Sequence, residues 1–118
     1  MIFVEEELEQ YQRQAQRLLL QLGLHAGWRQ GLYLLTALRL IHEKPERLQL
    51  VTKWLYPDVA AACHTTYAAV ERGIRVACDN IWYRGNYDLL IRITYFDRDR
   101  HPSPSLMLAY LYQYLLME

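Results

Sequence analysis

Apolar residues recur at spacings of three and four along most of this chain, and that helical period limits what it can fold into more than any other feature. The first 22 residues carry a seam of this kind over two heptads, formed by Leu8, Tyr11, Ala15, Leu18 and Leu22. Strand alternation is not sustained anywhere, and only "IRITYF" at residues 91–96 is compatible with a strand. The pattern predicts an all-α fold.

The helical pattern divides the chain into six or seven segments. They are residues 5–22, 30–42, 46–56, 57–64, 65–85, 86–96 and 105–118. Gly23 is expected to stop the first helix, and Gly85 with Asn86 the long one. Pro57 suits the first turn of a helix, and Ser103 before Pro104 predicts the cap of the last helix.

One face of each predicted helix is apolar. In the second helix this face is expected to hold Leu32, Leu35, Leu38 and Ile41, and in the third Leu48, Val51, Trp54 and Leu55. A length of 118 residues with 53% hydrophobic residues is enough for one compact, globular core. The sequence therefore predicts a single compact six- to seven-helix domain.

Charge is balanced overall but uneven along the chain. Thirteen basic and thirteen acidic residues give a formal net charge of zero, which argues against a protein with strong non-specific affinity for phosphates. Residues 1–10 contain Glu5, Glu6, Glu7 and Glu9 and no basic residue. The N-terminus is thus acidic and the remainder mildly basic.

Several functional classes find no support in the sequence. Cys63 and Cys78 are too few for a disulfide scaffold and are expected to be small buried apolar residues, and His64 beside Cys63 lacks a second ligand pair at zinc spacing. We expect no metal and no cofactor. "DRDRH", with Asp97, Asp99 and His101, is interpreted with Glu118 as solvated polar residues rather than as acid–base groups. We therefore do not expect an enzyme.

The N-terminus "MIFVEEELEQ" has neither the basic nor the apolar region of a signal peptide. No apolar run approaches the length of a membrane span. We expect a cytoplasmic protein without a membrane partner.

Residues 57–84 fit a helix-turn-helix, in which a short helix and a tight turn precede a helix with one apolar face. His64 stands where the turn requires a left-handed backbone, which histidine adopts more readily than most residues. Thr65 or Thr66 can cap the second helix. Its inward positions are Val70, Ile74, Ala77, Cys78 and Ile81.

The opposite stripe of this second helix consists of Ala68, Glu71, Arg72, Arg75 and Asp79. Arg72 and Arg75 project from neighbouring points, where their guanidinium groups can pair with guanine and Glu71 can accept from cytosine. Any solvated amphipathic helix carries a similar stripe, so both interpretations stay open on these residues alone. Gly73, a costly residue within a helix, predicts close packing against its backbone.

A family resemblance adds to this interpretation. "TKWLYPDVAAACHTTYAAVERGIRVACDNIWYRGN", residues 52–86, closely resembles the DNA-binding effector domain of the sporulation-initiation response regulator of endospore-forming bacteria. The shared motifs are "TK-LYP", "TT", "VER-IR" and "W-RGN", and "LGLHAGWRQGLYLL" upstream is similar to the family as well. The resemblance extends from Leu19 to the end of the chain. It divides the protein into an acidic helical extension, residues 1–18, and an effector-like domain, residues 19–118.

The resemblance implies a six-helix domain that binds double-stranded DNA with its recognition helix in the major groove. By position it assigns base contacts to Arg72 and Arg75, retains Glu71 beside them and gives Thr66 a phosphate contact. The Tyr67 hydroxyl can partly substitute for an arginine of the family that is missing here. Other positions depart from the family. Ala68 and Ala69 replace a serine and an arginine, and Gly73, His64 and Val76 replace an alanine, an asparagine and a histidine. We expect weaker binding, an altered sequence preference, or both.

Family members also carry a phospho-acceptor receiver domain, whereas only about 20 residues, an acidic helical segment, precede the resemblance here. If the chain is complete, aspartyl phosphorylation cannot control it. A homodimer is expected to use either the Leu8–Leu22 helix, whose seam can equally dock onto its own domain, or the last helix. That helix is apolar nearly all round, which predicts burial in the core or under a partner.

Two functions follow from these observations. The first is a sequence-specific DNA-binding transcriptional regulator. The alternative is a protein-interaction module that kept the fold but lost DNA reading, and that pairs with a full-length regulator. The alanines at 68 and 69, the acidic N-terminus and the apolar last helix favour the second.

Overall fold

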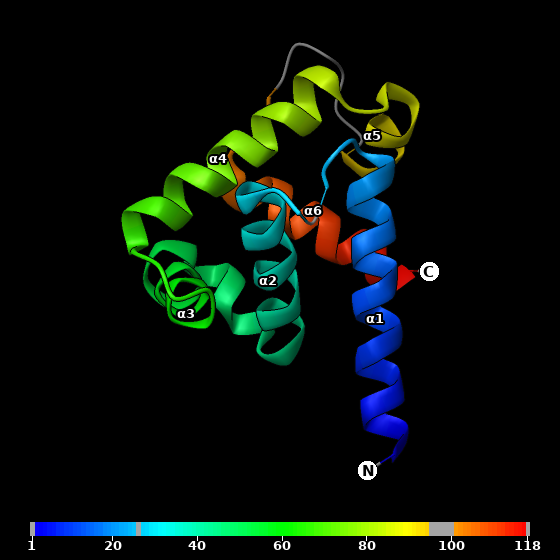
Figure 1. Cartoon of the computed structure of the whole chain (residues 1–118). Helices are drawn as coiled ribbons and strands as arrows, with labels where there is room; N and C mark the ends of the chain where they lie inside the picture. Colours follow the sequence, from blue (N-terminus) through cyan, green and yellow to red (C-terminus); the bar gives the residue numbers. More distant parts are fainter. Residues whose placement is uncertain (1, 26, 95–100, 118) are drawn as a thin grey trace.

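The fold was analysed in a computed structural model that describes residues 2–25, 27–94 and 101–117 (Figure 1). All regular elements of this part of the chain are helical, so the all-α prediction is confirmed. The elements are α1 (Ile2–Gln21), α2 (Arg29–Glu43), the 3₁₀ turn η1 (Pro45–Gln49), the π turn η2 (Val51–Leu55), α3 (Tyr56–Ala62), α4 (Tyr67–Arg84), α5 (Tyr87–Thr94) and α6 (Pro104–Met117).

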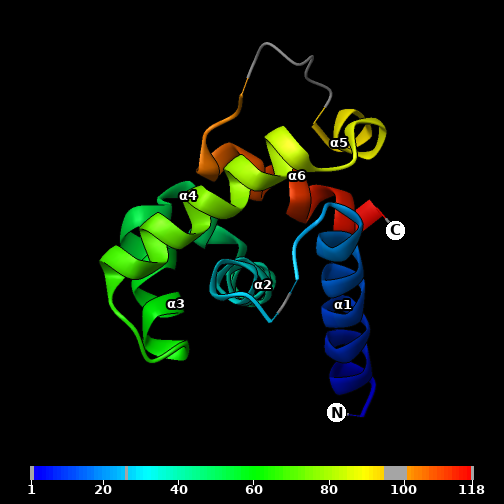
Figure 2. The same cartoon turned by 45° about the horizontal axis from the view of Figure 1, so that its top comes forward.

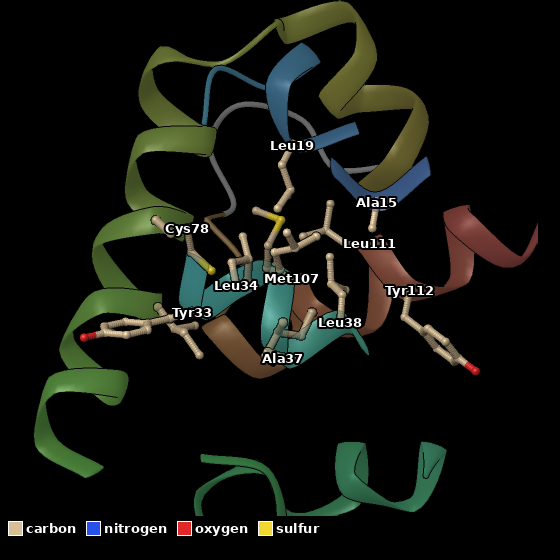
Figure 3. Close-up of a cluster of buried hydrophobic side chains, with 14 of the residues drawn as sticks. Ala15, Leu19, Tyr33, Leu34, Ala37, Leu38, Cys78, Met107, Leu111 and Tyr112 are labelled. Carbon is tan, nitrogen blue, oxygen red and sulfur yellow. The ribbon is translucent and has the colours of Figure 1, made fainter. Parts of the chain in front are cut away.

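The helix α2 forms the centre of the fold. Figures 1 and 2 place it between α1 on one side and the α3–α4 pair on the other, and α6 also packs against it. Leu34, Ala37 and Leu38 of α2 are inaccessible to solvent. In Figure 3 they meet side chains from the other helices, among them Met107 and Leu111 of α6. One core therefore joins both ends of the chain.

The N-terminal helix docks onto its own domain. Of the predicted seam, Tyr11, Ala15, Leu18 and Leu22 are buried and Leu8 is exposed. The Tyr11 hydroxyl donates to the backbone oxygen of Leu38 at 2.7 Å, and its ring stacks on His42 with centroids 4.0 Å apart. The predicted boundary after residue 18 falls within α1, which continues across it. A dimer through this seam would have to replace these contacts.

The prediction of one α-helix over residues 46–56 is wrong. The chain forms two unlike turns, η1 and η2, separated by Leu50 in a non-helical conformation. Arg47 gives the physical reason, because its guanidinium donates to the backbone oxygen of Leu40 at 2.6 Å and to the carboxylate of Asp58 at 3.0 and 3.1 Å. These bonds hold η1 between the end of α2 and the start of α3. Trp54, predicted on the apolar face, is 43% exposed.

The prediction that Leu32 faces the core is also wrong, because its side chain is 44% exposed, whereas Leu35, Leu38 and Ile41 are buried. Three successive steps of three residues do not follow one face of an α-helix. Each residue turns the helix by about 100°, so Leu32 lies about 180° from Ile41.

The predicted helix ends are confirmed. Gly23 follows α1 with a left-handed φ of 92°, and Gly85 follows α4. Pro57 lies in the first turn of α3, and the Ser103 hydroxyl accepts from the Leu106 N–H at 3.2 Å at the start of α6. The stretch considered for a strand is helical in α5 as far as Thr94, and residues 95 and 96 lie outside the described residues.

The last helix is only partly covered by the domain. Met107, Leu108, Leu111, Tyr112 and Leu115 are buried. Leu116 and Met117 at its end are 55% and 71% exposed.

None of the helices in the described ranges is both long and apolar enough to cross a membrane. The polar residues Asp97, Asp99 and Glu118 lie outside the described part of the chain.

Burial of two acidic groups predicts how the stability changes at high pH. Burial raises the pKa of the Cys78 thiol to about 12, as it does that of the Tyr56 hydroxyl, with a smaller contribution from neighbouring groups. Both groups are therefore neutral in the folded chain and ionise more easily on unfolding.

The stability that the Cys78 thiol and the Tyr56 hydroxyl contribute is complete below about pH 9 and is lost as the pH rises toward 12. Urea unfolding between pH 8 and 11 should show the free energy of unfolding falling by about 1.4 kcal/mol per pH unit for each group that ionises on unfolding. Cys78→Ala should make the decline begin about one pH unit higher, where the Tyr56 hydroxyl ionises in the unfolded chain. A flat profile in the native protein would contradict this.

Candidate nucleic-acid interface

The segment from α3 to α4 has the geometry of a helix-turn-helix. Val59 and Ala60 of α3 are buried, and the turn closes where the Thr65 N–H donates to the backbone oxygen of Ala60 at 3.0 Å. His64 has a left-handed φ of 54°, and no other non-glycine residue of the described chain has a positive φ. The expectation for this residue is confirmed, and its exposed side chain is not needed to hold the turn.

Thr66 caps α4. Its backbone is extended, and its Oγ1 accepts a hydrogen bond from the Ala69 N–H at 3.1 Å. This bond satisfies one of the N–H groups that the first turn of a helix leaves without a partner. The predicted cap is confirmed at Thr66 rather than Thr65.

Removal of this cap should have a measurable cost. We expect Thr66→Ala to lower the free energy of unfolding by about 1 kcal/mol, because the Ala69 N–H loses its acceptor. Thr66→Ser keeps a hydroxyl at the same place and is expected to retain most of the stability. Thermal and urea unfolding of both variants would test this, and equal loss in the two would show that the hydroxyl is not the cause.

The inner face of α4 is as predicted. Val70, Ile74, Ala77, Cys78 and Ile81 all have no accessible surface. Trp82 is buried with them and was not predicted, although it follows Cys78 by four residues on the same face.

Cys63, expected to be buried, is only half-buried, with its Sγ 3.5 Å from the Thr36 hydroxyl. No cluster of three possible metal ligands occurs among the described side chains.

Gly73 allows α4 to approach α2 closely. A Cβ at this position would lie 2.5 and 2.9 Å from two ring carbons of Tyr33. Tyr33 is buried, so its ring has little room to move away. The prediction of close packing at Gly73 is confirmed. The contact places Tyr33 directly behind the part of α4 that carries the charged stripe.

The outer stripe of α4 is exposed and has an internal charge pattern. Glu71 accepts from the Tyr67 hydroxyl at 3.3 Å and pairs with Arg75 at 3.5 Å. The Arg75 side chain remains 57% exposed, so the pair is screened by water and weak. Arg72 is exposed, and no partner for it is found among the described residues. Both guanidinium groups are therefore available to a ligand.

Tyr67 lies at the start of this stripe, beside the Tyr56 ring at a centroid distance of 6.0 Å. Desolvation raises the pKa of its hydroxyl above the ordinary value, and the Glu71 carboxylate raises it further. The hydroxyl donates its hydrogen bond to the Glu71 carboxylate. The structure brings Thr66, Tyr67, Glu71, Arg72 and Arg75 together along the first half of α4.

A shallow groove of about 180 Å³ adjoins the Glu71–Arg75 pair. Its other lining residues are Val51, Thr52, Tyr56, Pro104 and Ser105. The hydroxyl-bearing residues Thr52 and Ser105 were not identified from the sequence as part of the site. Thr52 begins the motif "TKWLYP", and only the folding of η2 brings it beside α4. Ser105 comes from the start of α6, more than 25 residues further along the chain.

Asp79, the last residue of the stripe, belongs to a separate contact. Its carboxylate lies 2.9 Å from Nε2 of His101, whose ring also packs against Trp82 and Tyr83 with centroids 5.4 Å away. The Pro102 backbone oxygen lies 2.7 Å from the other ring nitrogen. These contacts attach the segment before α6 to the second half of α4 and leave Asp79 less available than the two arginines.

Comparison with known families identifies the domain. A family model described as the sporulation initiation factor Spo0A C terminal matches residues 15–115, which include the whole helix-turn-helix. This is a family of DNA-binding effector domains of transcription regulators and not an enzyme family. The match, the helical fold and the exposed arginines of α4 agree, and the chain belongs to the Spo0A C-terminal family of DNA-binding domains.

Proposed function

We propose that this protein is a sequence-specific transcriptional regulator that inserts α4 into the major groove of double-stranded DNA. The observation that carries the proposal is the exposed pair Arg72 and Arg75 on the outer face of a helix whose inner face is buried. The inner face of such a helix stays in the core while its two arginines face the groove.

Each side chain of the stripe has a proposed role. Arg72 and Arg75 donate to guanine, each pairing with the O6 and N7 atoms of one base. Glu71 accepts from a cytosine amine when Arg75 leaves it for a base. The Thr66 and Tyr67 hydroxyls, at the start of the helix, donate to phosphates and fix the register.

Selection from a random-sequence DNA pool at low salt tests the proposal. The native protein is expected to enrich a sequence motif, and Arg72→Ala/Arg75→Ala to enrich none, because each arginine contributes about 1–3 kcal/mol of discrimination. The control is Arg13→Ala/Arg17→Ala, which removes the same charge from exposed positions of α1. If neither the native protein nor this control enriches a motif, sequence-specific DNA binding is refuted.

The protein-interaction module is the second candidate, and exposed apolar residues favour it. Ala68 offers no polar group to DNA, and Leu116 and Met117 are open to solvent at the end of α6. A complex with a full-length regulator, formed without retention of any DNA probe, is the result expected of such a module. Loss of that complex on Leu116→Gln/Met117→Gln, with an unchanged melting temperature, would assign it to α6.

A homodimer on DNA is proposed to use this same end of α6 rather than the Leu8–Leu22 helix, whose seam is occupied by its own domain. Sedimentation of the protein with and without its DNA site would give the stoichiometry. A two-to-one complex that becomes one-to-one on Leu116→Gln/Met117→Gln supports this interface. A stoichiometry unaffected by these substitutions contradicts it.

A further inference from the structure

A second concavity lies apart from the stripe of α4 discussed so far. It has a volume of about 400 Å³ and lies between the end of α2 and the start of α3. Its lining comes from η1, η2 and the adjoining helix ends, and consists of Lys44, Glu46, Arg47, Lys53, Trp54 and Asp58. We call it the lysine cleft, because Lys44 and Lys53 are the only lysines of the chain.

The charges of the lysine cleft do not cancel. Arg47 neutralises Asp58 through two hydrogen bonds from its guanidinium to the same carboxylate oxygen. Lys44 and Lys53 are exposed, and neither has an ion-pair partner within the described ranges. Glu46 is then the single opposing carboxylate, so the open part of the cleft carries a net positive charge.

The lysine cleft and the groove beside Arg75 are lined by neighbouring residues of η2. Thr52 lines the groove beside Arg75, and the next two residues, Lys53 and Trp54, line the lysine cleft. Arg47 bonds to the Leu40 backbone oxygen and to Asp58, and these bonds fix the η1 side of the cleft relative to α3. The positively charged cleft therefore adjoins, through η2, the groove that contains Arg75.

We infer that the lysine cleft contacts DNA phosphates next to the bases approached by α4, with Lys44 and Lys53 as the phosphate-binding residues. The ammonium group of lysine suits this role, because it neutralises a phosphate without demanding one geometry. The contacts would add affinity without sequence preference and so compensate for the polar groups missing at Ala68 and Ala69. This inference rests on the proposed DNA-binding function.

The salt dependence of DNA binding tests the inference. The probe is the duplex enriched by the native protein, and the variants are Lys44→Ala, Lys53→Ala and both together. Each phosphate contact that is lost should reduce the slope of log affinity against log salt by about 0.9 and weaken binding roughly eightfold at about 0.1 M salt. The enriched sequence should not change.

Two further variants set the direction of the effect. Lys53→Arg keeps the charge and should bind with the native slope. Glu46→Gln removes the opposing carboxylate and should strengthen binding, the reverse of the lysine variants. Arg13→Ala/Arg17→Ala, on α1, should leave the slope unchanged. Because all these positions are exposed, unchanged melting temperatures are expected throughout.

A direct measurement uses the small number of lysines. Reductive methylation with ¹³C-formaldehyde labels Lys44, Lys53 and the α-amino group, and the two single variants assign the lysine signals. On addition of the duplex, both lysine signals should shift. Native slopes in the lysine variants, together with unshifted signals, would overturn the inference. If Arg72→Ala/Arg75→Ala still abolishes binding in that case, the proposed function stands; if the native protein binds no duplex, both fail.

Discussion

Replacing Gly85 with alanine is expected to lower the free energy of unfolding by about 3 kcal/mol, because the added methyl group meets two backbone oxygens. A Cβ at this position would collide with the backbone oxygen of Ile81 and lie 2.9 Å from that of Leu22. Both obstacles are backbone atoms, one in the last turn of α4 and the other at the end of α1. The Ile81 oxygen can move only by disturbing the hydrogen bond that it accepts from the Gly85 N–H, and the Leu22 oxygen only by moving the end of α1 away from α4.

The matched control is Gly27→Ala. No atom lies within 4 Å of a Cβ at Gly27, so this substitution is expected to change the stability by no more than about 0.5 kcal/mol. Urea unfolding followed by circular dichroism measures both. Equal stability of the two variants would mean that α1 and α4 can separate at little cost, which the close approach of Leu22 to Gly85 contradicts.

Gly73→Ala is the second large effect, and its sign is opposite to the usual one. Alanine in place of glycine within a helix normally stabilises by about 0.5–1 kcal/mol. Here the added methyl group meets the buried Tyr33 ring at 2.5 Å, and overpacking of this kind costs about 1–3 kcal/mol. We expect a net loss of about 1–2 kcal/mol in the free energy of unfolding.

A double-mutant cycle with Tyr33→Leu isolates this contact. The smaller side chain leaves room for the methyl group, so Gly73→Ala should stabilise the Tyr33→Leu protein by up to about 1 kcal/mol. The reversal of sign is the diagnostic result. Destabilisation of similar size in both backgrounds would show that Tyr33 is not the obstacle and that α4 resists alanine for another reason.

The helix ends and the inner face of α4 could be predicted from the sequence because short-range physics determines them. Gly23, Thr66 and Ser103 act on backbone groups within three or four residues of themselves, and the inward residues of α4 follow the period of a single helix. The left-handed conformation of His64 was predictable for the same reason. In each of these cases the pattern and the conformation involve the same few residues.

The segment between α2 and α3 could not be predicted in this way. The conformation of residues 45–55 depends on Arg47, which bonds to Leu40 and Asp58, seven residues before it and eleven after it. Helical spacing of apolar residues contains no information about such a bond. The same limit applies to the candidate site, since Arg72 and Arg75 could be placed on one helix face, whereas their neighbours Thr52 and Ser105 are brought there by tertiary folding.

The central position of α2 has a consequence for the order in which the fold is completed during synthesis. Helices α1, α3 and α4 can contact α2 before α6 is made, but Met107, Leu108 and Leu111 reach the core only after α6 has been synthesised. Until they do, part of the apolar surface of α2 has no cover. The domain therefore cannot close until α6 has left the ribosome, and a nascent protein that stalls after α5 exposes an incomplete core.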